Sequence, residues 1–342
     1  MVLIYNYLWL KKVILPERVE NMSADKYFSV PLKAIVPSFR IPFNIYLFIN
    51  NHFILYRKGN DELEEEVYSK LQMKKIKFLF IQEEDRGEYE KYEKRVNRID
   101  AAIEEAVASP LGQLKTSIES KLEEEIEKED IEKNINSISD LAETAAKDLV
   151  EELKKKSYSV KLLSHLTAHS NGIYSHCTNV STLAIHLAMK LGYRQDHVLE
   201  NIGSAGLLHD IGKIKINTDL LTKSFNNYTP DEIRLLKKHP EVGRGLLLAV
   251  TGSPEEVRLI VYQHHECHDG SGYPEKLRGS KIYELTKILS IVNTFEHLFQ
   301  GMKTREDFSI KQIITCMNSK NVSPRFDPKT LAKCLAILGE VK

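Results

Sequence analysis

Histidines are concentrated in one part of this chain, and their spacing indicates metal binding. Ten of the twelve histidines lie between residues 165 and 268, where His209 is followed directly by Asp210 and His264 directly by His265. Neutral imidazoles together with a carboxylate are the ligands that a borderline divalent ion prefers. Because one aspartate has two oxygens, it can also bridge two ions. The residue types therefore point to a metal site of one or two ions.

The elements that must position these side chains are predicted helices. His176 begins an apolar stripe that continues at residues 180, 183 and 187, and His264 extends a stripe at residues 257, 260 and 261. Capping boxes are predicted at Thr229 and at Ser253. A single histidine on such a stripe is usually a hydrogen-bonded core residue. The hypothesis therefore rests on the whole set, which is His176, His209, Asp210, His239, His264 and His265.

The most specific pattern is His264-His265-Glu266-Cys267-His268-Asp269-Gly270-Ser271-Gly272-Tyr273-Pro274. The string resembles the signature of the HD-GYP family, a branch of the HD metal-dependent phosphohydrolases that hydrolyses cyclic di-GMP in bacteria. The resemblance extends over about residues 157–300 and implies an all-α HD-type helical bundle. It also implies a dinuclear site of Fe or Mn ions and hydrolysis of the phosphodiester bond by a metal-activated hydroxide.

The resemblance assigns roles to individual residues. It implies that Asp210 bridges two metals, with His239, His264 and His265 on one metal and His176 and His209 on the other. Lys213 matches the family lysine that contacts the substrate phosphate. Gly270 and Gly272 would let the backbone approach the substrate or adopt a positive φ. Tyr273 either contacts the substrate or packs within the loop, and Glu266 and Asp269 either orient imidazoles or make loop hydrogen bonds.

Three positions depart from the family pattern. Asn293 replaces the last ligand, an aspartate, and offers a neutral oxygen without charge, so it is a weaker ligand. Gly301-Met302-Lys303-Thr304-Arg305 replaces an Arg-Pro-Tyr run that grips substrate, and Gly172 replaces a glutamate associated with a third metal. Three hypotheses follow: a cyclic di-GMP phosphodiesterase, a degenerate domain that binds nucleotide or signalling proteins without turnover, and a phosphohydrolase for another nucleotide.

The rest of the chain predicts an α+β N-terminal module before the helical bundle. The expected divisions are an extension over 1–26, the α+β module over 27–87 and a charged helical connector over 88–156. They continue with the HD-GYP domain over 157–300 and a helical tail over 301–342. Asn50-Asn51 is predicted to join two strands as a hairpin. The connector either packs on the catalytic domain and forms a homodimer contact or is a solvated linker.

Composition excludes some classes of function. The 342 residues have a formal net charge of zero, which argues against a nucleic-acid polymer as partner and against a polybasic membrane anchor. The four cysteines are scattered and are expected to be reduced thiols in a cytoplasmic protein. The apolar stretch at residues 1–15 is interrupted by Lys11-Lys12 and is too short to span a bilayer.

Overall fold

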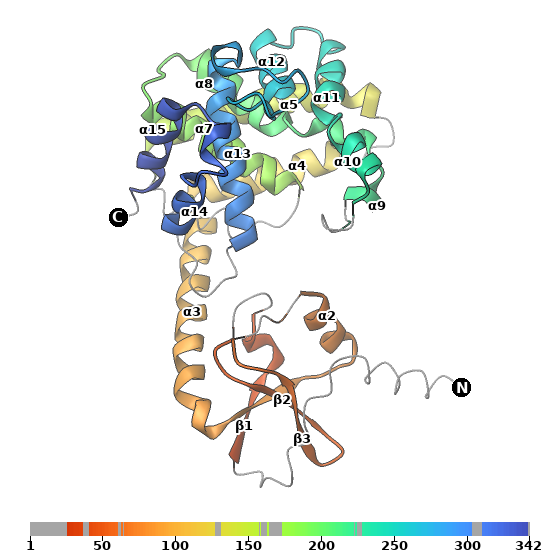
Figure 1. Cartoon of the computed structure of the whole chain (residues 1–342), viewed down its shortest axis with the longest axis vertical. Coiled ribbons are helices and arrows are strands. Elements are labelled where there is room, and N and C mark those ends of the chain that lie inside the picture. Colours follow the sequence, from red (N-terminus) through yellow and green to blue (C-terminus); the bar gives the residue numbers. More distant parts are fainter. Residues whose placement is uncertain are drawn as a thin grey trace, which may run out of the picture. The chain divides into compact units, whose positions relative to one another are not determined.

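The computed structural model describes residues 26–36, 41–60, 63, 65–126, 131–156, 158, 163, 173–221, 223, 228–302 and 310–340 (Figure 1). The expected N-terminal extension up to residue 25, Gly172 and residues 303–305 lie outside these ranges. The chain divides into two compact units, residues 1–101 with 302–308 and residues 102–301 with 309–342. Each unit is described by itself below, and the predicted division into five segments stays a prediction.

The first unit contains a four-stranded sheet with strand order β1-β4-β2-β3, made by β1 (Tyr27–Pro31), β2 (Ile45–Ile49), β3 (His52–Arg57) and β4 (Phe78–Gln82). All its paired strands are antiparallel. The predicted hairpin joins β2 to β3, and Asn50 and Asn51 have φ values of 50° and 62°. Asparagine tolerates such left-handed backbone conformations better than most residues do. The sequence prediction of this turn is therefore confirmed.

The first unit also contains η2 (Leu32–Ala34), α2 (Glu65–Met73), η3 (Glu83–Asp85) and the part of α3 (Arg86–Ala108) up to residue 101. Apolar residues of the sheet and of its connections form one core, to which α3 contributes Tyr89 and Tyr92. Both tyrosine rings make edge contacts with the buried ring of Phe43, at centroid distances of 5.7 and 5.5 Å. These contacts fix the start of α3 on the α+β module. The predicted fold class is thus confirmed for this module.

The regular secondary structure among the described residues of the second unit is helical, apart from one isolated β-bridge between Asp269 and Arg278. Its longer helices are α4 (Pro110–Ile126), α5 (Ile131–Lys155), α7 (Ile173–Lys190), α8 (Asp196–Leu208), α11 (His239–Leu248), α12 (Glu255–Gln263), α13 (Glu284–Met302) and α15 (Pro328–Leu338). Its shorter elements are η4 (Ile211–Lys215), α9 (Thr218–Leu221), α10 (Pro230–Leu236), η6 (Gly279–Lys281), α14 (Ile310–Met317) and η7 (Ser323–Arg325).

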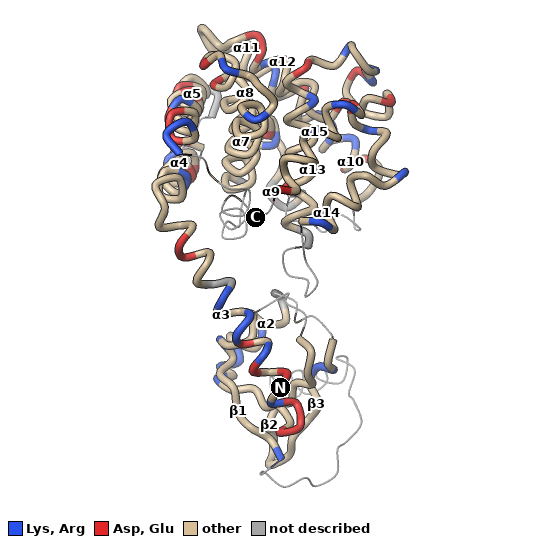
Figure 2. The backbone as a smooth tube through the Cα atoms, turned by 90° about the vertical axis from the view of Figure 1, so that its left-hand side faces the viewer, with Lys and Arg blue, Asp and Glu red and all other residues tan. Residues whose placement is uncertain are grey.

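Helix α8 packs against α5, α7 and α12, while α11 packs against η4 and α12 (Figure 1). Helices α4 and α5, from the stretch expected to connect the two modules, pack on each other and on α7. They carry basic and acidic residues along their length (Figure 2), but their apolar side, including Leu111, Ile118 and Leu122, is buried. The connector helices are therefore part of the packed second unit.

Close backbone contacts bring the histidine-bearing helices together. A Cβ atom on Gly212 would collide with the backbone of His239, so only glycine lets η4 approach the start of α11 this closely. The approach brings Asp210, which precedes η4, beside His239.

The two capping boxes predicted from the sequence differ in outcome. The capping box at Thr229 is present, whereas α12 is capped by Pro254 without a side-chain hydrogen bond, so the box predicted at Ser253 is wrong.

The search of the described helices for a segment that is long and apolar enough to span a membrane finds none.

Candidate metal centre

The site is organised around Asp210, whose side chain is only 4% exposed. Its two carboxylate oxygens face different histidines. Oδ1 lies 3.2 Å from His239 Nε2 and 3.9 Å from His264 Nε2. Oδ2 lies 3.6 Å from His209 Nε2 and 3.9 Å from His176 Nε2. The carboxylate thus stands between two pairs of imidazoles, one pair on each oxygen.

Within each pair, the two imidazoles direct the same type of atom toward one another. The Nε2 atoms of His176 and His209 are 3.2 Å apart, and those of His239 and His264 are 3.1 Å apart. Two nitrogens bound to one ion at about 2.1 Å stand roughly 3.0–3.4 Å apart in octahedral or tetrahedral geometry. The spacing of both pairs therefore fits the coordination of a divalent ion.

Hydrogen bonds on the other ring nitrogen determine which nitrogen faces the carboxylate. Nδ1 of His209 donates to the carbonyl oxygen of Gly206 at 2.9 Å, that of His239 to Leu236 at 2.7 Å and that of His264 to Val261 at 2.7 Å. Each acceptor lies three residues earlier, where a helix or turn leaves its last carbonyl groups free. A proton on Nδ1 leaves a lone pair on Nε2, so the facing nitrogens are acceptors that a cation would bring together.

His176 is oriented by a side chain instead. Its Nδ1 donates to Oε2 of Glu296 on α13, a residue with 0% exposure of the side chain. The other oxygen of Glu296 accepts from Asn179 Nδ2 at 3.2 Å and from Gln300 Nε2 at 2.9 Å. Burial raises the pKa of Glu296, but the hydrogen bond and charge of His176 outweigh it and lower the pKa below its ordinary value. Because both oxygens are engaged, Glu296 acts as a partner of His176 rather than as a free ligand.

The electrostatic environment favours the neutral form of three of the histidines, His209, His264 and His265, and the charged form of Asp210. Burial lowers the pKa of His209 to about 3. Burial, followed by the neighbouring imidazoles, also holds the pKa of His264 and of His265 well below its ordinary value. Burial raises the pKa of Asp210, but His209, Lys213 and His239 together lower it to well below its ordinary value. Neutral imidazoles and an ionised carboxylate are the forms that bind a metal ion.

Three groups of side chains have ligand atoms within 4.8 Å of one another among the described residues: Asp210 with His239, His264 and His265; His176 with His209 and Asp210; and His176 with Glu296 and His297. The first two groups contain all six residues that the sequence predicted as the core of a metal site. The structure brings these six together, and their binding of metal stays a prediction.

Lys213 and Tyr273 lie at the edge of the same site. Lys213 Nζ donates to Asp210 Oδ2 at 2.6 Å, and its side chain remains 25% exposed. The ring of Tyr273 stacks on His265 with a centroid distance of 4.7 Å and an interplanar angle of 21°. Burial raises the pKa of the Tyr273 hydroxyl above its ordinary value. Tyr273 therefore packs against a candidate ligand, and its contact with substrate stays a prediction.

The loop after His265 is held by its own hydrogen bonds. Glu266 accepts from the backbone N–H groups of Glu275 and Leu277 at 2.6 and 2.8 Å, and Asp269 Oδ1 accepts from Ser271 N and Oγ at 2.9 and 2.6 Å. The acidic residues of the signature thus order the loop. Gly270 has a φ of +78°, and a side chain on Gly272 would collide with backbone atoms of the same loop. Both glycines are explained by loop geometry, and their approach to a substrate stays a prediction.

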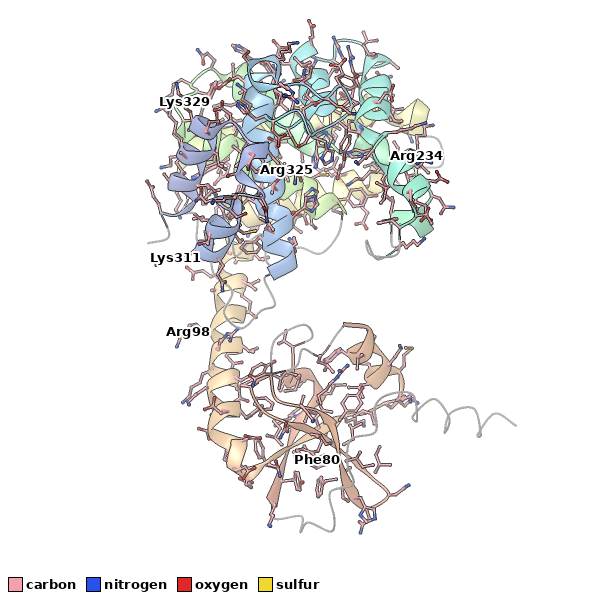
Figure 3. All side chains as sticks on the ribbon, in the orientation of Figure 1. Phe80, Arg98, Arg234, Lys311, Arg325 and Lys329 are labelled. Carbon is pink, nitrogen blue, oxygen red and sulfur yellow. The ribbon has the colours of Figure 1, made fainter. Side chains whose placement is uncertain are left out.

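The tail also touches this loop, although the sequence showed no chemistry in it. Arg325 at the end of η7 (Figure 3) accepts a hydrogen bond from His268 N at its carbonyl oxygen, 2.8 Å away. Its side-chain Nε donates to the sulfur of Cys267 at 3.5 Å. The tail therefore supports the loop that follows the tandem histidines.

Asn293 occupies α13 one turn before Glu296. It is 4% exposed, and its Oδ1 has no hydrogen-bond partner within the described part of the chain. A buried acceptor without a partner is energetically unfavourable. An unpartnered side-chain oxygen of this kind is expected of a weak neutral ligand in the absence of its ion.

Glu296 was not predicted from the sequence. Its only signal was its position three residues after Asn293, on the same face of a helix.

Known proteins are similar to the helical unit that carries this candidate site. A model of the HD domain matches residues 140–330. The cyclic di-GMP phosphodiesterase response regulator RpfG of Xanthomonas campestris is 30% identical over 186 residues, which are 54% of this chain and 48% of that protein. The 3'3'-cGAMP-specific phosphodiesterase 1 of Vibrio cholerae is 29% identical over 178 residues, which are 52% of this chain and 40% of that protein. The matches thus span less than half the length of these two relatives.

A solved structure shares the fold. Bd1817, described as a HDG"Y"P protein from Bdellovibrio bacteriovorus, aligns with a TM-score of 0.54 and 24% identity over 92% of this chain and 99% of that one. At this identity the likeness shows the fold alone. The family model matches more than half of the present chain, within the helical unit that carries the site. This chain belongs to the HD domain family.

Proposed function

We propose that this chain is a metal-dependent phosphodiesterase that hydrolyses a cyclic dinucleotide, with cyclic di-GMP as the first candidate substrate. One observation carries the proposal: the oxygens of Asp210 face two separate pairs of imidazoles whose Nε2 atoms are 3.2 and 3.1 Å apart. This donor set fits two divalent ions, for which we propose Fe or Mn. RpfG and the V. cholerae protein are named for the hydrolysis of cyclic dinucleotides, and their similarity supports the same reaction class.

Asp210 and Lys213 have different roles in the proposed hydrolysis. Ions held at the site would lower the pKa of water and offset negative charge on the phosphate oxygens. Asp210 holds both halves of the site at a fixed separation, because its two oxygens belong to one rigid carboxylate. Lys213 is partly exposed and has a raised pKa, since Asp210 outweighs the lowering effect of burial. We infer that it donates to a phosphate oxygen of the substrate, where a fixed positive charge stabilises the transition state.

A second function is favoured by Asn293. By the family resemblance, the His176–His209 half has Asp210 but lacks a second carboxylate, because Asn293 stands in its place, so a domain that binds the nucleotide without hydrolysing it is the alternative. A third hypothesis is a phosphohydrolase for another nucleotide, because the run expected to grip the substrate is replaced. Binding without hydrolysis predicts no product, and the third hypothesis predicts cleavage of a nucleotide other than cyclic di-GMP.

The test uses the purified full chain loaded with Mn²⁺, or with Fe²⁺ under anaerobic conditions. Cyclic di-GMP, 3'3'-cGAMP and cyclic di-AMP are supplied separately, and the products are resolved by chromatography. We expect metal-dependent cleavage of at least one substrate, and no cleavage by Asp210→Asn. The matched control, Asp231→Asn, changes an exposed aspartate on α10 and should behave like the wild type. Bound metal without any product would reject the enzyme hypothesis, and tight nucleotide binding in that case would support the alternative.

A further inference from the structure

Lys115 is a buried lysine that lies outside the six predicted ligands. It is located on α4, and only 4% of its surface is exposed, whereas lysines are almost always found at the surface. An ammonium group removed from water is unfavourable unless hydrogen bonds and opposite charges compensate. We therefore expect hydrogen bonds and opposite charges within the packed unit to stabilise the ammonium group of Lys115.

A continuous set of hydrogen bonds leads from Lys115 to the metal centre. Lys115 Nζ donates to Oδ1 of Asn179 on α7. The amide nitrogen of Asn179 donates to Oε1 of Glu296 at 3.2 Å, and the other oxygen of Glu296 accepts from His176 Nδ1. The opposite nitrogen of His176 lies 3.9 Å from Asp210 Oδ2. Three helices, α4, α7 and α13, contribute to this route.

The donor-only ammonium group at one end and the acceptor-only carboxylate of Glu296 fix the direction of each hydrogen bond in the route. An ammonium group has donors only, so it requires the oxygen of the Asn179 amide on its side. The NH₂ group of Asn179 must then face Glu296. Asn179 follows His176 by three residues on α7 and so lies on the same helix face. Without the lysine, the oxygen of Asn179 loses its donor and is left as a buried acceptor without a partner, which weakens the hold of this amide beside Glu296.

The surrounding charges are consistent with a charged lysine at this position. Burial lowers the pKa of Lys115 to about 8, and the carboxylates of Glu119 and Glu296 act in the opposite direction. Glu119 stands one turn later on α4, where Ser175 Oγ donates to its Oε2 at 3.2 Å. The lysine is therefore held between one carboxylate on its own helix and one on α13.

We propose that Lys115 is a positioning residue for the His176–His209 half of the metal centre. It orients Asn179, which supports the Glu296 carboxylate, which in turn holds His176 Nε2 toward Asp210. The other half does not depend on this route, because His239 and His264 are oriented by backbone carbonyls. The inference rests on the proposed metal site and adds that one of its two ions depends on α4.

The helix that carries Lys115, α4, begins directly after α3. Helix α4 begins at a tight corner after α3, where the hydroxyl of Ser109 accepts a hydrogen bond from Gly112 N at 3.1 Å. A Cβ atom on Gly112 would collide with the carbonyl groups of Ala106 and Val107. The start of α4, the helix that carries Lys115, is therefore packed closely against the last turn of α3. Through Lys115, occupancy of the His176–His209 half is linked to the orientation of α4.

The test measures ion binding directly. Lys115→Met keeps the length of the side chain and removes its charge, and Lys121→Met is the matched control on the exposed side of α4. Mn²⁺ is titrated into the metal-free full chain by calorimetry, and the melting temperature of the metal-free protein is recorded. We expect one of two Mn²⁺ sites to weaken about tenfold in Lys115→Met, as is typical when the partner of a ligand is removed. The second site and the control should be unchanged.

Two further measurements separate positioning from simple structural support. Removing one partner of a buried, hydrogen-bonded charge is destabilising, so the metal-free Lys115→Met protein should melt lower than the wild type, and the positioning role is judged by the loss of affinity at one Mn²⁺ site and not at the other. Glu296→Gln should weaken the same Mn²⁺ site, and the double variant should be no weaker than Glu296→Gln alone. Equal weakening of both sites, a lower melting temperature with unchanged ion affinity, or additive effects in the double variant would overturn the inference.

Failure of this inference can be told apart from failure of the proposed function. A wild-type protein that binds two Mn²⁺ ions but hydrolyses no cyclic dinucleotide defeats the proposed function and leaves the role of Lys115 measurable. A wild-type protein that binds no ion on the His176–His209 side refutes the role of Lys115, whatever its turnover.

Discussion

Replacing Asn293 with aspartate would restore the charge that the family pattern has at this candidate ligand position. The side chain is 4% exposed, and its Oδ1 has no hydrogen-bond partner within the described residues. Asparagine and aspartate have nearly the same shape. The variant therefore introduces a negative charge with little change in packing, and the expected effects in metal-free and metal-loaded protein have opposite signs.

In the metal-free protein the new carboxylate is buried without a partner. Burial alone would raise its pKa by roughly two to three units, and each unit corresponds to about 1.4 kcal/mol. The metal-free variant should therefore lose about 3 to 4 kcal/mol of unfolding free energy at pH 7. For a unit of this size that loss lowers the melting temperature by about 10 °C.

In the metal-loaded protein the same charge is a ligand. We expect the ion on the His176–His209 side to bind at least about tenfold more tightly, since charge on the ligands strengthens the binding of divalent ions. At ion concentrations well above the dissociation constant, each tenfold gain adds about 1.4 kcal/mol of stability. The increase in melting temperature on adding Mn²⁺ should thus be larger in Asn293→Asp than in the wild type by about 3 to 6 °C per tenfold gain.

The assay is thermal unfolding with and without Mn²⁺, combined with calorimetric titration of the ion. Asn318→Asp is the matched control, because Asn318 is exposed on the same unit and should change neither quantity. The reasoning is refuted if Asn293→Asp melts earlier without metal and yet binds Mn²⁺ with wild-type affinity. That result would mean that the side chain at position 293 does not face the ion.

Three further variants test other parts of the structure. Lys213→Met should keep both ions bound and lower the turnover of the cyclic dinucleotide about 100-fold or more, which steady-state kinetics on protein of measured metal content would show. The pKa of Lys115 is about 8 in the folded protein, and the ordinary value of 10.5 applies to the unfolded chain. Between these two pH values the unfolded chain therefore binds more protons than the folded one. The stability of the metal-free wild type should therefore rise with pH across this window by at most about 3 kcal/mol. Urea unfolding of Lys115→Met at pH 7.5 and 9.5 should lack this rise. Gly272→Ala should destabilise the signature loop because its Cβ would meet backbone atoms, whereas Gly245→Ala, with open space around it on α11, should melt as the wild type does or slightly higher.

The sequence was informative where local patterns and motif spacing determine the outcome. The Asn50-Asn51 hairpin and the Thr229 capping box follow from local chemistry, and both are present. The capping box at Ser253 had the same residue types but is absent, because Pro254 is extended and takes the cap position itself. Ser253 Oγ is left without a hydrogen-bond partner among the described residues. A pattern of residue types thus does not show which residue leaves the helical conformation.

The residues that orient the candidate ligands could not be predicted in the same way. The six candidate ligands share a residue type, so their clustering is visible in the sequence. Glu296 and Lys115 are ordinary helix residues in two charged helical patterns, and only the packing of α4, α7 and α13 brings them to Asn179. A charged residue on a helix is usually solvated. Their burial therefore depends on tertiary contacts that no local pattern encodes.

The two halves of the site differ in what holds them, and this difference indicates where affinity can vary. His239 and His264 are fixed by carbonyl groups three residues earlier, in the last turns of α10 and α12, so their geometry persists wherever those helix ends form. His176 is fixed by Glu296, and Glu296 depends on side chains from two other positions. The family resemblance predicts that the uncharged Asn293 also belongs to this half. Because the weaker ligand and the longer chain of supporting contacts belong to one half, ion occupancy should respond to mutation or to movement of α4 on the His176 side first. The half that contains His264 and His265 should retain its ion under the same changes.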